Sequence, residues 1–148
     1  MKNLYLSLIA LIGISATASA QSFTNASASL PSTYHSGNVV GVTDMDNDGF
    51  DDIIIMDASN HLHIVYQTPN GLEEYDYGVL SGSDQWGMTV GDMDNDGHND
   101  VISGGAYDGV HYVRITAPGV FTEETLPNGD IFMQANNCAD IEIGRAHV

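Results

Sequence analysis

Cationic side chains are scarce in this sequence. It holds three Lys and Arg residues against 20 Asp and Glu residues, and its formal net charge is −17. A protein needs cations to replace the counterions of a phosphate backbone, so this composition excludes a nucleic-acid partner. The same imbalance repels anionic membrane surfaces. The acids are clustered, and Val, Ile, Leu and Tyr are plentiful between the clusters. This pattern predicts a folded protein whose charge is neutralised by bound metal rather than a disordered chain.

Cysteine occurs once, as Cys138. A single thiol forms no internal disulfide, so the fold needs another source of stability. We interpret Cys138 as a small buried apolar side chain rather than a reactive thiol.

Long apolar runs are also missing, apart from Leu4–Ile14. This run follows Lys2 and precedes the small residues Ala18 and Ala20, which is the pattern of a signal peptide cleaved after Ala20. It is shorter than the roughly 20 residues that a membrane span takes. We therefore expect residues 1–20 to be removed, and the mature chain to be secreted or held at the cell surface without membrane insertion.

One six-residue stretch, Asp-Met-Asp-Asn-Asp-Gly, occurs twice. Its copies at Asp44–Gly49 and Asp92–Gly97 are 48 residues apart, and Asp140 stands a further 48 residues on. Periods of about 40–50 residues are typical of β-propeller blades. The expected divisions are a lead-in or last strand of another blade at 21–37, a first repeat at 38–85, a second at 86–133 and the start of a third at 134–141.

Within each repeat, side chains alternate in character along the chain. Leu62, Ile64 and Tyr66 share one face of an extended segment, and His61, His63 and Val65 share the other. Gly, Asn and Pro separate such segments. We expect strands near 38–43, 53–57, 60–67 and 72–79, with the second set 48 residues later. The predicted fold class is all-β, with propeller blades of four antiparallel strands: two blades and the start of a third.

Carboxylates recur at positions 1, 3, 5 and 9 of both loops. They are Asp44, Asp46, Asp48 and Asp52 in the first loop, and Asp92, Asp94, Asp96 and Asp100 in the second. A glycine at position 6 permits a sharp turn, and position 7, Phe50 or His98, can offer its main-chain carbonyl. Ca²⁺ takes 6–8 oxygen ligands, whereas Mg²⁺ retains its waters, so the spacing favours two structural Ca²⁺ sites.

An EF-hand shares the opening of this pattern but needs an acidic ligand at position 12, at the start of a helix. Position 12 is Ile55 in the first loop and Ser103 in the second. The flanking segments also read as strands. Both observations exclude an EF-hand.

The stretch WGMTVGDMDNDGHNDVIS (Trp86–Ser103) closely resembles the signature of the FG-GAP/VCBS-type repeat, and the resemblance extends over roughly residues 36–141. It implies a β-propeller, usually seven-bladed, like the head of integrin α subunits, with calcium in the loop between the first two strands of a blade. It implies that the eight aspartates are calcium ligands, together with the carbonyls of Phe50 and His98. Asp51 has Asn99 as its counterpart, so we expect Asp51 to face solvent.

The end of the chain departs from this pattern. Asp140 would begin a third loop, but Glu142, Gly144 and Arg145 stand where Asp, Asp and Gly are required. Residues 142–148 can be encoded by bases that resemble the start of a sequencing adapter. We therefore interpret them as a non-native tail and expect the native gene to continue. Because at least about three repeats are usually needed for stability, we expect the chain alone to be marginally stable.

Some histidine and aromatic side chains could also take part in binding. His61 and His63, with His111 at the place of His63 one repeat later, form a possible transition-metal pair. No third ligand is evident in the sequence, so exposed strand histidines are the favoured reading. Trp86 and the aromatics of Glu73–Tyr77 could stack on sugars, but packing explains them as well. No catalytic motif is present, so we expect no catalytic residue.

These patterns, with the resemblance, favour a secreted calcium-binding propeller that acts as a binding or adhesion scaffold. Its ligand would be an extracellular protein or carbohydrate. The alternative is a non-catalytic propeller portion of a larger secreted enzyme, such as one acting on polysaccharide. A purely structural spacer in a surface protein is a third possibility.

Overall fold

Eight strands make up nearly all the regular structure of the described part of the chain. The computed structural model describes residues 24–107, 109–127, 131–135 and 137. The strands are β1 (Ser36–Thr43), β2 (Asp52–Asp57), β3 (His61–Thr68), β4 (Gly71–Val79), β5 (Gln85–Gly91), β6 (Asp100–Gly105), β7 (Val110–Ala117) and β8 (Val120–Leu126). A short 3-10 helix, η1 (Ser27–Ser29), precedes them.

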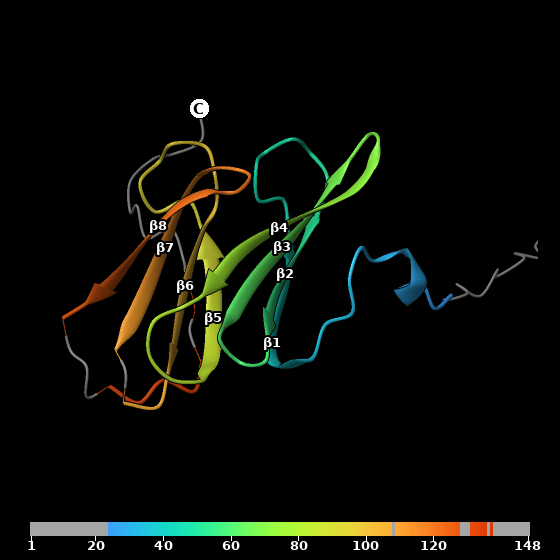
Figure 1. Cartoon of the computed structure of the whole chain (residues 1–148). Helices are drawn as coiled ribbons and strands as arrows, with labels where there is room; N and C mark the ends of the chain where they lie inside the picture. Colours follow the sequence, from blue (N-terminus) through green and yellow to red (C-terminus); the bar gives the residue numbers. More distant parts are fainter. Residues whose placement is uncertain (1–23, 108, 128–130, 136, 138–148) are drawn as a thin grey trace, which may run out of the picture.

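The strands form two four-stranded antiparallel sheets, ordered β1-β2-β3-β4 and β5-β6-β7-β8 (Figure 1). The expected all-β class with four-stranded units is confirmed, and the expected strands differ from the observed ones by two residues or fewer. Among the described residues the two sheets close no ring. Described residues 24–35 of the lead-in contain η1 and no strand. Cys138, Asp140, the expected signal peptide and the expected tail lie outside the described residues.

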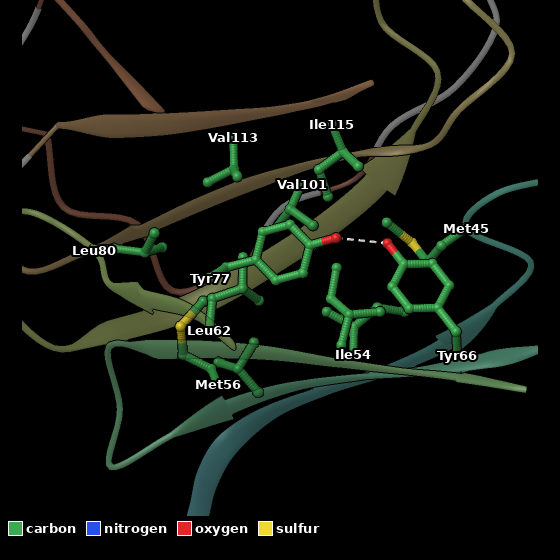
Figure 2. Packing of buried hydrophobic residues seen from close by; sticks show 12 residues of the cluster. Met45, Ile54, Met56, Leu62, Tyr66, Tyr77, Leu80, Val101, Val113 and Ile115 are labelled. Carbon is green, nitrogen blue, oxygen red and sulfur yellow. Dashed lines mark hydrogen bonds between the residues drawn. The ribbon is translucent and has the colours of Figure 1, made fainter. Parts of the chain in front are cut away.

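The core lies between the two sheets. Leu62, Ile64 and Tyr66 on one face of β3 belong to the buried core. Figure 2 shows Leu62 and Tyr66 on the side of the first sheet that faces Val113 and Ile115 of β7. Each such side chain contributes about 1.5–3 kcal/mol when buried. The hydroxyls of Tyr66 and Tyr77 share a hydrogen bond of 2.7 Å inside this core. The core members are Val39, Met45, Ile54, Met56, Leu62, Ile64, Tyr66, Tyr77, Leu80, Val101, Val113 and Ile115.

The opposite face of the first sheet is partly covered by the lead-in. Leu30 and Tyr34 line a pocket with Val40, Ile53 and Ile55 of β1 and β2. The side chain of Tyr34 also packs against His63 of β3, and the centroids of the Tyr34 and His63 rings lie 5.5 Å apart. The segment before β1 therefore packs on the histidine-bearing face of the first sheet.

Candidate metal centre

The two aspartate loops occupy equivalent places in the two sheets. The first connects β1 to β2 and the second connects β5 to β6, and both lie at the same end of the molecule (Figure 1). Their backbones match: φ is 62° at both Asn47 and Asn95, 93° at Gly49 and 95° at Gly97. Asn and Gly are the residues that accept this left-handed region most readily, which explains why the loop sequence requires them.

The first aspartate of each loop organises the turn. The carboxylate of Asp44 accepts hydrogen bonds from the N–H groups of Asp48 (3.1 Å) and Gly49 (2.9 Å). In the second loop Asp92 accepts the same pair of bonds from Asp96 (3.1 Å) and Gly97 (3.0 Å). Each loop is thus folded around its own position 1 carboxylate.

Positions 1, 3 and 5 converge in both loops. One carboxylate oxygen from each of Asp44, Asp46 and Asp48 lies within 4.8 Å of the other two. Asp92, Asp94 and Asp96 form the same group in the second loop. The structure therefore brings together six of the ten predicted ligands, as two triads of carboxylates.

The position 9 aspartates lie outside these triads and hold the loops to the sheets. Asp52 is buried, and it accepts hydrogen bonds from the N–H groups of Met45 (2.7 Å) and Gln67 (2.8 Å). In the second sheet the buried Asp100 accepts the equivalent bonds from the N–H groups of Met93 (3.0 Å) and Ile115 (2.8 Å). Both carboxylates thus join their loop to a neighbouring strand of the sheet. Their remaining oxygen lone pairs are still suited to a cation.

Position 7 was expected to supply a carbonyl ligand. The structure places Phe50 and His98 at the closing ends of the loops, where their N–H groups donate to the side chains of Asp48 (2.8 Å) and Asp96 (2.9 Å). These bonds fix the local backbone. The role of the two carbonyls as ligands stays a prediction.

The electrostatics of the first loop favour a bound cation. The Oδ1 atom of Asp46 is buried and has no hydrogen-bond partner. Burial, with the neighbouring Asp48, raises the pKa of the Asp46 carboxyl above its ordinary value. Burial also raises the pKa of Asp52, and the charges of Asp46 and Asp48 add to the shift. A divalent cation would offset this desolvation and repulsion, so this all-oxygen donor set fits Ca²⁺.

The loops differ in one charged contact. The Nε atom of Arg114 lies 3.3 Å from Oδ2 of Asp94, at position 3 of the second loop. The equivalent residue of the first sheet, 48 positions earlier, is Tyr66, whose hydroxyl bonds to Tyr77 in the core. Arg114 therefore partly neutralises the second triad. In the first triad, Asp46 is the counterpart of Asp94, and its Oδ1 atom has no hydrogen-bond partner.

The loops are also in direct contact. Asn99, at position 8 of the second loop, donates from Nδ2 to the carbonyl of Asp44 at 2.6 Å and from its N–H to the carbonyl of Met45 at 2.8 Å. Asp51, at position 8 of the first loop, is exposed as expected. The difference between Asn99 and Asp51 is visible in the aligned loops, but the contact of Asn99 with the other loop depends on how the two sheets pack.

The expectation of exposed strand histidines is wrong. His111 is only 1% exposed, because its face of β7 is turned toward the first sheet, and its Nδ1 lies 2.9 Å from Oε1 of Glu123. His63 is also largely buried, beneath Tyr34, and a third metal-ligating group lies beside it and His61: the carboxylate of Asp76 on β4. Asp76 could not be recognised from sequence spacing, because the pairing of β3 with β4 is what brings it beside His61 and His63.

The aromatic residues of β4 pack against other side chains of the protein. Tyr77 is buried in the core, and Tyr75 packs edge-on against Tyr66, with ring centroids 5.6 Å apart. Trp86 lies against Phe132 with centroids 5.0 Å apart.

Paired four-stranded sheets, each with an acidic loop between its first two strands, define an all-β repeat protein built from propeller-like blades. A family model described as FG-GAP-like repeat matches residues 44–103, from position 1 of the first loop to the strand that follows the second. Residues 44–103 are therefore similar to FG-GAP-type repeats. No curated protein gives a significant match to the chain, and no solved structure does so either.

Proposed function

We propose that this chain is an exported, calcium-stabilised scaffold that presents a binding surface. The observation that carries the proposal is the pair of equivalent carboxylate triads, Asp44/Asp46/Asp48 and Asp92/Asp94/Asp96. Fixed turns hold these like charges together on a chain that already carries strong net negative charge. A resident divalent cation in each loop supplies the counter-charge.

Calcium has a structural role in this proposal. The three triad carboxylates of each loop, with Asp52 or Asp100 below them, would hold the ion, and the ion would join the first two strands of its sheet. Extracellular calcium modules bind at about 10⁻⁴–10⁻³ M, which matches external calcium. At calcium concentrations about 100 times the dissociation constant, each site would stabilise the folded state by about 2.7 kcal/mol.

Calorimetric titration of the full chain with CaCl₂ tests the proposal. We expect two sites, with one lost in Asp46→Asn, one lost in Asp94→Asn and both lost in the double variant. Asp51→Asn is the matched control, because it removes the same charge from an exposed residue beside the triad and should retain both sites. Unchanged calcium uptake in the double variant would refute the assignment.

The scaffold role rests on the same architecture. Loops at the ends of a rigid sheet are the usual place for binding residues, and calcium would hold two of them in a fixed shape. We propose an extracellular protein or carbohydrate as the ligand. Among the described residues, no helix is long and apolar enough to cross a membrane. We expect the chain to be retained on immobilised extracellular glycans or matrix proteins when calcium is present. The double variant should not be retained. Retention that chelation does not change would argue against a scaffold held by calcium.

A further inference from the structure

A second group of metal-ligating side chains lies at the other end of the first sheet. His61 begins β3 on the side away from the aspartate loops, and His63 follows it on the same face (Figure 1). One ligand atom from each of His61, His63 and Asp76 lies within 4.8 Å of the other two. The two imidazole rings have centroids only 4.2 Å apart.

A strand irregularity creates this group. Residue His63 pairs with Asp76, but Leu62 pairs with Gly78, so the register shifts between them and Tyr77 is the extra residue of β4. The shift brings Asp76 within reach of both histidines. Its Oδ1 lies 2.6 Å from Nε2 of His61 and also accepts the N–H of Gly78 at 2.7 Å, which fixes the carboxylate. Bulges of this kind commonly redirect a side chain toward a site.

A second carboxylate lies close to His63. Oε1 of Glu74 lies 2.9 Å from Nδ1 of His63, and its Oε2 accepts a hydrogen bond of 2.5 Å from the hydroxyl of Ser32. The contact with His63 lacks hydrogen-bond geometry, so Glu74 places a second carboxylate beside the ring without fixing its tautomer. The lead-in residue Ser32 holds this acid in place.

From this geometry we propose that His61, His63 and Asp76 form a binding site for a late first-row divalent cation, with Zn²⁺ as its probe. Two imidazoles and a carboxylate are the donor set that such ions prefer, whereas Ca²⁺ prefers oxygen alone. A single cation between neutral imidazoles satisfies all three residues.

The site differs in chemistry and in place from the aspartate loops, so the two proposals fail separately. The full chain, kept in saturating CaCl₂ to occupy the loops, would be titrated with ZnCl₂ in a calorimeter. We expect a single Zn²⁺ site whose affinity falls by about tenfold or more in His61→Gln and in Asp76→Asn. The Asp46→Asn/Asp94→Asn variant should retain this zinc site.

His35→Gln is the matched control, since it removes an exposed histidine that lies outside the group. The Asp76 side chain is 58% exposed, so Asp76→Asn should keep the fold, which circular dichroism checks. In histidine-detected NMR, zinc should shift the ring resonances of His61 and His63 and leave those of His35 unchanged. Absence of zinc binding in the parent chain, or equal affinity in His61→Gln and the parent, would overturn the proposal and leave these contacts as ion pairs only.

Discussion

The side-chain amide of Asn99 donates a 2.6 Å hydrogen bond to the main-chain carbonyl of Asp44, and so connects the two aspartate loops. Asp44 is position 1 of the first loop, the residue whose carboxylate organises that turn. The two candidate calcium sites are therefore linked by a hydrogen bond between their loops.

Asn99→Ala should lower the free energy of unfolding by about 1 kcal/mol, because it removes a partly buried hydrogen bond. Asp51→Ala, at the equivalent position of the first loop, should change stability by less than about 0.5 kcal/mol because Asp51 is exposed. Urea denaturation in the presence of calcium measures both values. Equal effects of the two substitutions would show that Asn99 has no special role between the loops.

Arg114 should weaken calcium binding in the second loop, since its guanidinium occupies the neighbourhood of Asp94. In an Asp46→Asn background, where only the second site remains, Arg114→Gln should raise the calcium affinity by about two- to fivefold. Arg114→Lys retains the charge and should raise it less. Titration against a calcium-sensitive chelator reads out the affinity. If Arg114→Gln left the affinity unchanged, the contact would have no influence on the ion.

The tyrosine pair of the core should be sensitive to the loss of a single oxygen. The hydroxyl of Tyr77 bonds to that of Tyr66 at 2.7 Å and accepts the N–H of Gly119 at 3.0 Å. Tyr77→Phe preserves the ring but leaves two groups without their partner, so stability should fall by about 1–3 kcal/mol. Tyr66→Phe should cost less, because the Gly119 bond remains. Urea denaturation of the two single variants and the double variant gives a double-mutant cycle. If the two changes in the free energy of unfolding were strictly additive, the hydroxyls of Tyr66 and Tyr77 would not be coupled.

Without calcium, stability should rise as the pH falls from 7 toward about 4. Burial raises the pKa values of Asp46 and Asp52 in the folded state, so the folded chain binds more protons than the unfolded chain above the ordinary aspartate pKa of about 3.9. Below that point the trend should reverse, because the pKa values of Asp57 and Asp76 are lowered by hydrogen bonds from His35 and His61.

Thermal melts across this pH range, with and without calcium, test the trend. Asp46→Asn should reduce the rise, since it removes one of the titrating groups, and saturating calcium should abolish it. A calcium-free chain that loses stability steadily from pH 7 to 4 would contradict the expectation.

Much of the fold could be predicted from local pattern. The alternation of Leu62, Ile64 and Tyr66 with their neighbours indicated β3 and its buried face, and the 48-residue offset located the second sheet. Carboxylate spacing likewise identified the two triads, because turn geometry is local and each loop contains all that its turn requires.

What the sequence did not reveal depends on contacts between distant elements. Asp76 joins His61 only through the register shift between β3 and β4, and Asn99 meets Asp44 only because the sheets pack together. His111 looked like a surface residue because its burial is determined by the first sheet rather than by β7. A period-two pattern says which side chains share a face but not which face meets another sheet.

Among the described residues, every strand pairs only with strands that adjoin it in the sequence. Each sheet therefore holds all its hydrogen-bonding partners within one short stretch of chain, and no strand waits for a distant one. Because synthesis proceeds from the N-terminus, the first sheet can be completed while the second is still being made. The first sheet then offers Leu62, Ile64 and Tyr66 as a ready surface on which the next can assemble, so the order of emergence becomes the order of assembly.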